Sequence, residues 1–254
     1  MTSIFEYLKY FGITSSQEDI IDLLGEIKTK NLSFSESCGL LWALEKNTRD
    51  HKNMASRLKK ASMGKFKSIE QFDWNYPKKI DQDLYSHLIT LDFIKQHQNI
   101  LFRGASGLGK TTLAQNIGLA AVKQGYKVRF ESLSRMLADI LRQDSLPRME
   151  RRIKFFSSFD LLIVDELGYI VYDSASADVF FNLISQRHEK KSTIVTTNLS
   201  FKDWGTCFQS TSCLTALVDR FSQHAHIMDI EGEKSWRHSN RIARNLIYQL
   251  PPVK

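Results

Sequence analysis

The chain of 254 residues contains few of the residues that build covalently stapled or irregular proteins, with three cysteines and four prolines. Cys38, Cys207 and Cys213 are odd in number and show no Cys-x-x-Cys spacing. This excludes a disulfide framework and predicts free thiols in a reducing compartment. No low-complexity tract interrupts the chain, so we expect no long disordered linker.

Long hydrophobic runs are also missing. No apolar stretch approaches the roughly 18 residues that a membrane-spanning helix requires. The first twelve residues, MTSIFEYLKYFG, contain no charged segment followed by an apolar one, which argues against a secretory signal. We therefore expect a cytoplasmic protein with no membrane partner. The remaining composition, 42% hydrophobic and 25% charged, is that of an ordinary globular protein.

Basic residues exceed acidic ones by 35 to 28, which gives a net charge of +7. The excess is concentrated in three stretches, at residues 52–67, 142–154 and 234–254. Clustered cations favour a polyanionic partner such as nucleic acid. Solvated helix faces would explain the same stretches equally well, so composition alone leaves both interpretations open.

Residues 1–62 are expected to form a small all-helical domain. Ser15 with Glu18, and Ser33 with Glu36, have the spacing of capping boxes that precede apolar helical patterns. A connector at 63–84 follows, rich in aromatic residues. We assign the remainder, 63–254, to one larger domain with a short basic C-terminal segment from about residue 234.

After Asn99 the sequence alternates short apolar strands with helices. Strands are predicted at 100–103, 127–131, 161–164, 193–197 and 226–230. Helices are predicted at 111–123, 133–142, 174–190 and 215–223. Alternation of this kind is typical of an α/β fold with a central parallel sheet and helices on both faces.

A glycine-rich motif stands between the first of these strands and its helix. It fits G-x-x-x-x-G-K-[ST] at every fixed position and reads Gly104, Ala105, Ser106, Gly107, Leu108, Gly109, Lys110 and Thr111, with Thr112 beside it. Glycines let backbone N–H groups converge on phosphate oxygens, and a helix N-terminus adds a favourable dipole. We expect Lys110 to reach the β- and γ-phosphates of ATP and the Thr111 hydroxyl to ligate Mg²⁺. The motif therefore predicts a P-loop NTPase.

Two acids and an amide end the neighbouring strands. Asp165 and Glu166 follow the apolar run 161–164, and Asn198 follows 193–197. In P-loop enzymes an Asp here supports the Mg²⁺ shell, and the next acid can polarise the attacking water. Asn198 could bridge that water and the γ-phosphate. The second acid favours an NTPase that hydrolyses its nucleotide over a nucleotide-switched scaffold.

Together these motifs resemble the AAA+ ATPases, and the finer details resemble the IstB-type helpers of insertion-sequence transposition. The resemblance covers nearly the whole chain. Its most specific stretches are 150–154, 160–169, 197–201 with Trp204, and 219–221 leading into 224–226. It implies a three-layer P-loop sandwich that uses ATP and Mg²⁺. The replicative helicase loader DnaC is a near relative, so a loader is the alternative role.

The resemblance also implies roles for individual residues. Asn198 becomes the sensor-1 residue, Arg220 an arginine finger that reaches a neighbouring subunit, and Arg237 the sensor-2 arginine. Relatives usually carry Tyr before that last arginine, where this chain has Trp236. A finger acting in trans implies a homo-oligomer, a ring or a helical filament, with ATP sites between protomers. For Arg187 we expect a solvated helix end in preference to a subunit interface.

The expected partners are double-stranded DNA and a separate transposase. Initiator-type AAA+ proteins carry a helical insertion where residues 142–154 lie, so Arg148, Arg151, Arg152 and Lys154 are the candidates for phosphate contacts. A solvated helix paired through Glu150 is the other interpretation. Phe72, Trp74 and Tyr76 are expected to cover an adenine pocket or fill the core.

Overall fold

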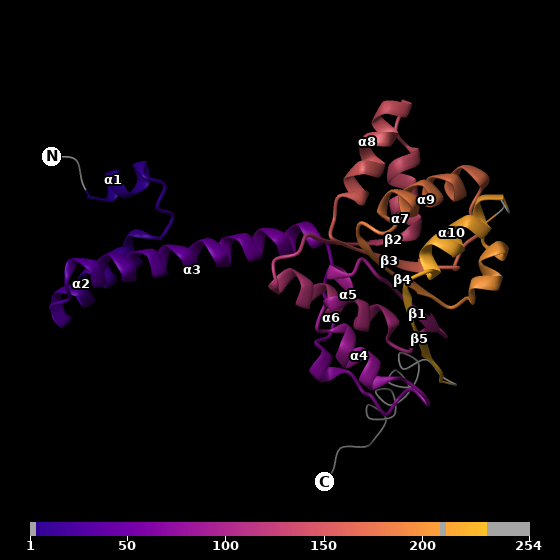
Figure 1. Cartoon of the computed structure of the whole chain (residues 1–254), viewed down its shortest axis with the longest axis horizontal. Helices are drawn as coiled ribbons and strands as arrows, with labels where there is room; N and C mark the ends of the chain where they lie inside the picture. Colours follow the sequence, from indigo (N-terminus) through magenta and orange to yellow (C-terminus); the bar gives the residue numbers. More distant parts are fainter. Residues whose placement is uncertain (1–3, 209–211, 233–254) are drawn as a thin grey trace, which may run out of the picture. The chain divides into compact units, whose positions relative to one another are not determined.

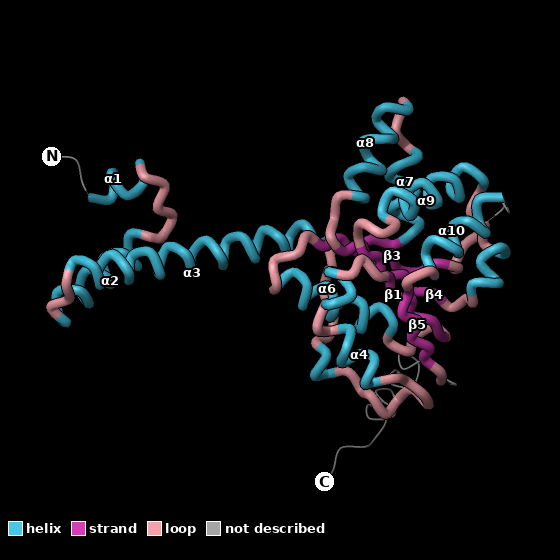
Figure 2. Tube along the Cα trace, viewed as in Figure 1, coloured by secondary structure: helices cyan, strands magenta, loops and turns pink. Residues whose placement is uncertain are grey.

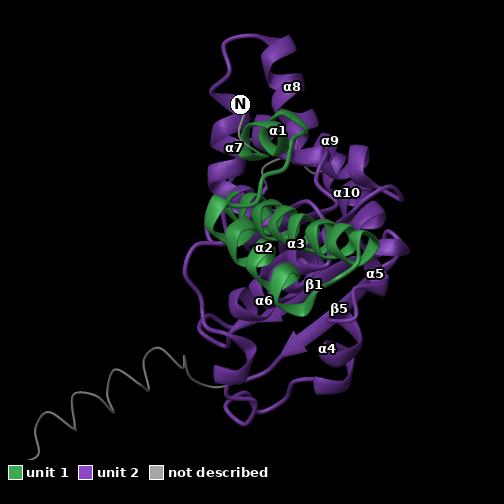
Figure 3. Ribbon diagram, turned by 90° about the vertical axis from the view of Figure 1, so that its left-hand side faces the viewer, with its two compact units in different colours: residues 1–59 green, residues 60–254 purple. Residues whose placement is uncertain are grey.

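The computed structural model describes residues 4–208 and 212–232, and Arg237 lies outside them. The chain forms two compact units, residues 1–59 and residues 60–254 (Figures 1 and 3). Among the described residues, no helix is both long and apolar enough to cross a membrane. Within the described residues, Cys38, Cys207 and Cys213 form no disulfide, as predicted.

The first unit is helical. It contains α1 (Ile4–Tyr10), α2 (Gln17–Lys30) and most of α3 (Phe34–Ala61). The capping box at Ser33 is confirmed, because the Ser33 N–H donates to Glu36 Oε2 at 2.8 Å and the Glu36 N–H donates to Ser33 Oγ. The box at Ser15 is wrong by one residue, since Ser16 caps α2 by accepting from the Asp19 N–H.

Ser15 instead donates hydrogen bonds to the buried carboxylate of Glu45. That carboxylate accepts the N–H and hydroxyl groups of both Thr14 and Ser15, and Arg49 Nε lies 2.5 Å away. Burial by itself would raise the pKa of Glu45, but the hydrogen bonds from Arg49, Thr14 and Ser15 outweigh it and lower the pKa to about 2. Glu45 therefore fixes the loop before α2 to the middle of α3.

The second unit is built on a five-stranded sheet in the order β2-β3-β4-β1-β5, with every neighbouring pair parallel. Figure 2 shows the strands stacked through the centre of this unit. The strands are β1 (Asn99–Gly104), β2 (Val128–Ser132), β3 (Leu161–Leu167), β4 (Ser192–Thr197) and β5 (Ala225–Ile230). All five lie within a few residues of the predicted positions, and the expected central parallel sheet is confirmed.

Helices cover both faces of the sheet, which gives the expected three layers. They are α4 (Gln82–Leu88), α5 (Asp92–Lys95), α6 (Lys110–Lys123), α7 (Leu133–Leu141), α8 (Leu146–Ser157), α9 (Ser174–Arg187) and α10 (Ser212–Ser222). Short 3-10 turns lie at η1 (Ile69–Gln71) and η2 (Phe201–Thr206).

Strand residues alternate between the two faces, as the pleat requires. Leu162 and Val164 belong to the main core beneath α7, α9 and α10. Ile163 faces α6, where a Cβ on Gly118 would come within 2.7 Å of its Cδ1 atom. The absence of a side chain at Gly118 therefore lets α6, which follows the glycine-rich loop, pack closely on the sheet.

Arg187 contradicts the expectation of a solvated helix end or an interface residue. Its guanidinium is buried and donates to the Thr193 hydroxyl and to the carbonyls of Phe156, Ser157, Phe159 and Ser192. Three of these carbonyls lie at the C-terminal end of α8, where a cation is favoured by the helix dipole. Burial lowers the pKa of Arg187 to about 9, so the group stays charged at neutral pH.

Candidate nucleotide site

The glycine-rich loop runs from the end of β1 to the first turn of α6. Gly109 is the N-cap of α6 with φ of 93°, a left-handed conformation that suits glycine. A Cβ there would come within 2.3 Å of Phe72, and one on Gly104 within 2.2 Å of the Ile230 carbonyl oxygen. The loop therefore depends on glycine for both its turn and its close packing, and it ends at a helix N-terminus, which suits phosphate.

Lys110 and Thr111 open α6. The Lys110 ammonium donates to the carbonyl oxygens of Gly104 and Ala105, at 2.7 and 2.8 Å. The Thr111 hydroxyl donates to Asp165 Oδ1 at 2.9 Å. Thr111 and Asp165 lie far apart in the sequence, but the fold brings their side-chain oxygens together. Oxygen atoms are the ligands that Mg²⁺ prefers. These two side chains fit a magnesium ion.

Asp165 and Glu166 lie at the end of β3 but have different environments. Asp165 is buried, whereas Glu166 is exposed. The register between β3 and β4 is irregular from Val164 to Leu167, and Glu166 has φ of 66°. A non-glycine residue in this conformation costs on the order of 1 kcal/mol, and such strain is concentrated at functional sites. This irregularity in the strand therefore gives the two consecutive acids different surroundings, with Asp165 buried and Glu166 exposed.

Thr196, in the adjacent strand β4, was not singled out from the sequence. Its buried hydroxyl donates to Asp165 Oδ1 and accepts the Glu166 N–H at 3.1 Å. Threonine is common in buried strands, so only the strand pairing reveals this contact.

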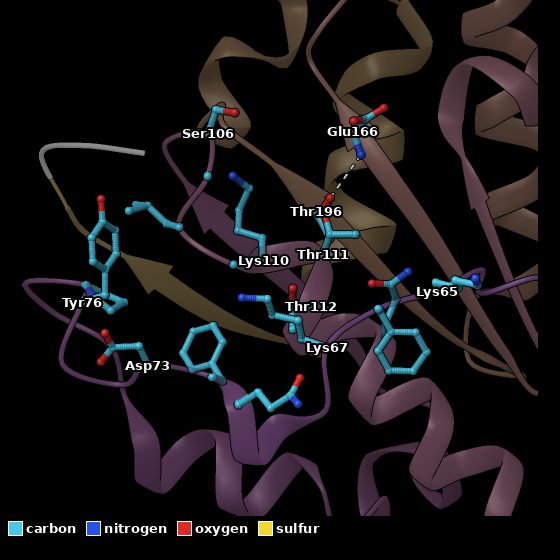
Figure 4. Close-up of a pocket in the computed structure, with 18 of the residues that line it drawn as sticks. Lys65, Lys67, Asp73, Tyr76, Ser106, Lys110, Thr111, Thr112, Glu166 and Thr196 are labelled. Atoms are coloured by element: carbon cyan, nitrogen blue, oxygen red, sulfur yellow. Dashed lines mark hydrogen bonds between the residues drawn. The ribbon is translucent and has the colours of Figure 1, made fainter. Parts of the chain in front are cut away.

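A cavity of about 450 Å³ beside the loop is lined by residues 106–112 of the loop and α6 and by Glu166 and Thr196. Figure 4 shows Lys110, Thr111, Thr196 and Glu166 on one side of it, with Asp73 and Tyr76 across from them. The connector contributes much of the wall, including Lys65, Lys67 and Phe72. With Lys110, three lysines line the cavity, which suits a ligand carrying several negative charges.

The connector is held in place by side chains of α6. Gln115 Nε2 donates to the Met63 carbonyl at 2.7 Å, and Asn116 Nδ2 donates to the Lys67 carbonyl at 3.0 Å. Of the aromatic residues predicted to cover a pocket or fill the core, Phe72 and Tyr76 line the cavity. Trp74 packs edge-on between Phe72 and Tyr85, at 4.8 and 5.3 Å between ring centroids.

Asn198 and Arg220 are not among the residues that line this cavity. Asn198 is exposed. Arg220 lies on α10, where its guanidinium stacks 4.8 Å from the Phe181 ring centroid. Its Nη1 atom is buried without a hydrogen-bond partner among the described residues. Arg237, the predicted sensor-2 arginine, lies outside the described residues.

The basic segment, residues 142–154, connects α7 to α8 and continues through most of α8. Arg152 makes its contacts inside the hairpin of α7 and α8. Its Nε donates to Asp139 at 2.6 Å, and its guanidinium stacks on Phe155. Arg148 is exposed and pairs with Asp144. Arg151 and Lys154 are exposed and form no ion pair within the described part of the chain. The expected pairing through Glu150 is likewise not seen there.

Comparison with known proteins agrees with this site. The family model described as IstB-like ATP binding protein matches residues 9–243. The ATP-binding protein of insertion sequence IS232 from Bacillus thuringiensis subsp. berliner is 35% identical over 92% of each chain. That of insertion sequence IS21 from Pseudomonas aeruginosa is 34% identical over 91% of this chain and 87% of its own.

Among solved structures, a DNA replication initiation factor superposes with a TM-score of 0.55 at 18% identity, covering 73% of this chain and 56% of that one. At this identity the likeness shows the fold alone, which is the P-loop fold of the AAA+ proteins. The glycine-rich loop, the acid pair at the end of β3 and the matching family model lead to one conclusion: the chain belongs to the IstB-like family of insertion-sequence ATP-binding proteins.

Proposed function

We propose that this protein is a Mg²⁺-dependent ATPase that assembles on target DNA and assists a separate transposase. The observation that carries the proposal is the 2.9 Å contact between the Thr111 hydroxyl and Asp165 beneath a lysine-lined cavity. Family membership supports ATP as the ligand. The relatives' place in insertion sequences supports transposition as the process.

Different residues of the site bind the phosphates, hold the metal ion and polarise the attacking water. Loop N–H groups and Lys110 hold the phosphates, with the ammonium exchanging its two carbonyl partners for phosphate oxygens. Thr111 and Asp165 hold Mg²⁺, which when bound neutralises charge on the phosphates. Glu166 polarises the attacking water from its exposed position at the cavity wall.

Two further residues complete the proposed site. Asn198 lies at the end of β4, two residues beyond Thr196, and acts as the sensor of the γ-phosphate. Arg220 acts as an arginine finger on the ATP of a neighbouring protomer, which requires an oligomer with sites between subunits. Its unpartnered Nη1 atom supports this role, because a buried guanidinium N–H without an acceptor is costly.

DNA binds to the exposed basic face of α8, through Arg148, Arg151 and Lys154. The contacts are to backbone phosphates, so they tolerate sequence and weaken with salt. The N-terminal helical unit supplies the surface for the transposase. The exposed side chains of Phe34 and Trp42 in α3 support a protein partner there.

The experiment is ATP-dependent assembly on duplex DNA, followed by strand transfer with the transposase proposed as the partner. We expect large complexes with ATP, none with Lys110→Ala, and stimulated strand transfer. Glu166→Gln is expected to trap a stable ATP-bound complex on DNA. Assembly that ignores ATP would contradict the proposal. Capture of a replicative helicase by the N-terminal unit, with no effect on transposase, would favour a helicase loader instead.

A further inference from the structure

Thr196 occupies an unusual position beneath both acids of the site. It lies in β4 with 2% of its surface exposed, and its hydroxyl is engaged on both sides. The O–H donates to Asp165 Oδ1, and the oxygen accepts the Glu166 N–H at 3.1 Å. A hydroxyl has one hydrogen to donate, and Thr196 uses it on the acid that also contacts Thr111.

The bond to Glu166 replaces one that the strand cannot supply. Because the register between β3 and β4 is irregular from Val164 to Leu167, the ladder skips Glu166. The Thr196 hydroxyl takes its N–H instead, at the point where Glu166 has φ of 66°. Without that hydroxyl the N–H would lose its partner, and the left-handed backbone that turns the Glu166 side chain to the cavity would lose a restraint.

The bond to Asp165 restrains the other acid. Asp165 Oδ1 accepts from both Thr196 and Thr111, one hydroxyl from β4 and one from α6. The carboxylate is thereby held in one orientation between the sheet and the first turn of α6. One oxygen atom of Thr196 thus fixes the metal-holding acid and the backbone of the water-polarising acid together.

We infer that Thr196 is a positioning residue for ATP hydrolysis, an inference that rests on the proposed ATPase function. Its hydroxyl is engaged by Asp165 and by the Glu166 N–H, so it acts through these two acids. Removing its hydroxyl therefore lowers kcat and leaves ATP binding by the loop and Lys110 intact. Partners that orient the groups holding a metal commonly change activity by about 10- to 100-fold when they are lost.

The test compares three substitutions in the full-length protein. Thr196→Val removes the hydroxyl at nearly constant volume, and Thr196→Ser keeps the hydroxyl and removes the methyl. Thr193→Val is the matched control, because Thr193 is an equally buried threonine of β4 whose hydroxyl contacts Arg187 and not the acids. Each variant is measured for kcat, KM, ATP dissociation constant and Tm.

We expect Thr196→Val to lower kcat about 10- to 100-fold with KM and ATP affinity close to wild type, and Thr196→Ser to recover most of kcat. Thr193→Val is expected to lower Tm without lowering kcat. In a Glu166→Gln background, Thr196→Val should cost much less than it does alone, because residues that act as a unit are not additive. Should Thr196→Val fail to fold, Thr196→Ala takes its place.

The inference alone is overturned if wild type hydrolyses ATP and Thr196→Val retains the kcat of Thr193→Val. It is also overturned if Thr196→Ser is as slow as Thr196→Val, since the hydroxyl would then be irrelevant. A wild-type protein that binds ATP and never hydrolyses it would overturn the proposed function together with this inference.

Discussion

At the scale of single residues, each unit contains a buried charged side chain that forms hydrogen bonds with main-chain groups. Arg187 donates to four carbonyls and one hydroxyl at the junction of α8 and β4. Glu45 accepts from the N–H and hydroxyl groups of Thr14 and Ser15. In each case one side chain satisfies several polar groups that lie in loops or at the ends of helices and strands.

Replacing Arg187 with Met tests this role in the second unit. The change preserves much of the volume but leaves buried carbonyls without donors, so we expect a loss of about 3 kcal/mol, or roughly 6 to 12 °C in Tm. Thermal unfolding of the full chain measures it. Arg148→Met, at an exposed ion pair, is the control and should change stability by less than about 1 kcal/mol. Equal effects of the two substitutions would contradict the buried role.

Glu45 makes the stability of the first unit depend on pH. Its pKa is about 2 in the folded protein against 4.5 for the ordinary side chain. Because the folded pKa is lowered, its stabilisation is fully present above about pH 4.5 and is lost as pH falls toward 2. We expect the Tm difference between wild type and Glu45→Gln to be constant from pH 7 to 5 and to shrink below pH 4.5. A difference that grows on acidification would refute this.

Residue identities were predictable where a motif specifies them. Gly104 to Thr111 could be assigned because phosphate binding demands glycines, a lysine and a hydroxyl at fixed spacing. Asp165 could be assigned because it ends an apolar strand, where P-loop enzymes have an Asp that supports the Mg²⁺ shell. Thr196 and Arg187 could not be found this way, since their importance depends on strand pairing and burial that no local pattern encodes.

At the scale of elements, the alternation of apolar strands and helices was sufficient to predict all five strands. The predictions for single side chains were wrong where a tertiary contact competes with a local one. Ser15 and Ser16 both suit an N-cap, and the tertiary contact of Ser15 with Glu45 leaves the cap to Ser16. The hairpin of α7 and α8 shows the same limit, because Arg152 is drawn inward by Asp139 and two aromatic rings.

That hairpin gives a prediction for DNA binding. Arg151→Ala and Lys154→Ala should each weaken duplex binding across sequences and reduce the slope of log K against log salt by about 0.9. Lys123→Ala, an exposed lysine at the end of α6, should leave the slope unchanged. Fluorescence anisotropy over a salt series measures the effect. Unchanged slopes for the α8 variants would remove this helix from the DNA interface.

At the scale of the whole molecule, the proposed site is completed by an arginine from a neighbouring protomer. The proposed arginine finger, Arg220, stacks on Phe181 of its own chain. We therefore expect Arg220→Ala to bind ATP normally and to lose most DNA-stimulated hydrolysis. Mixing it with Lys110→Ala should restore activity, because each variant supplies what the other lacks. Normal hydrolysis by assembled Arg220→Ala would exclude the finger.

The role of Glu166 is tested most directly by measuring ATP binding and single-turnover hydrolysis together, on wild type and Glu166→Gln with Mg²⁺ and duplex DNA. We expect both proteins to bind ATP with similar affinity and Glu166→Gln to hydrolyse it at least about 100-fold more slowly. Hydrolysis by Glu166→Gln at the wild-type rate would show that this acid does not polarise the attacking water.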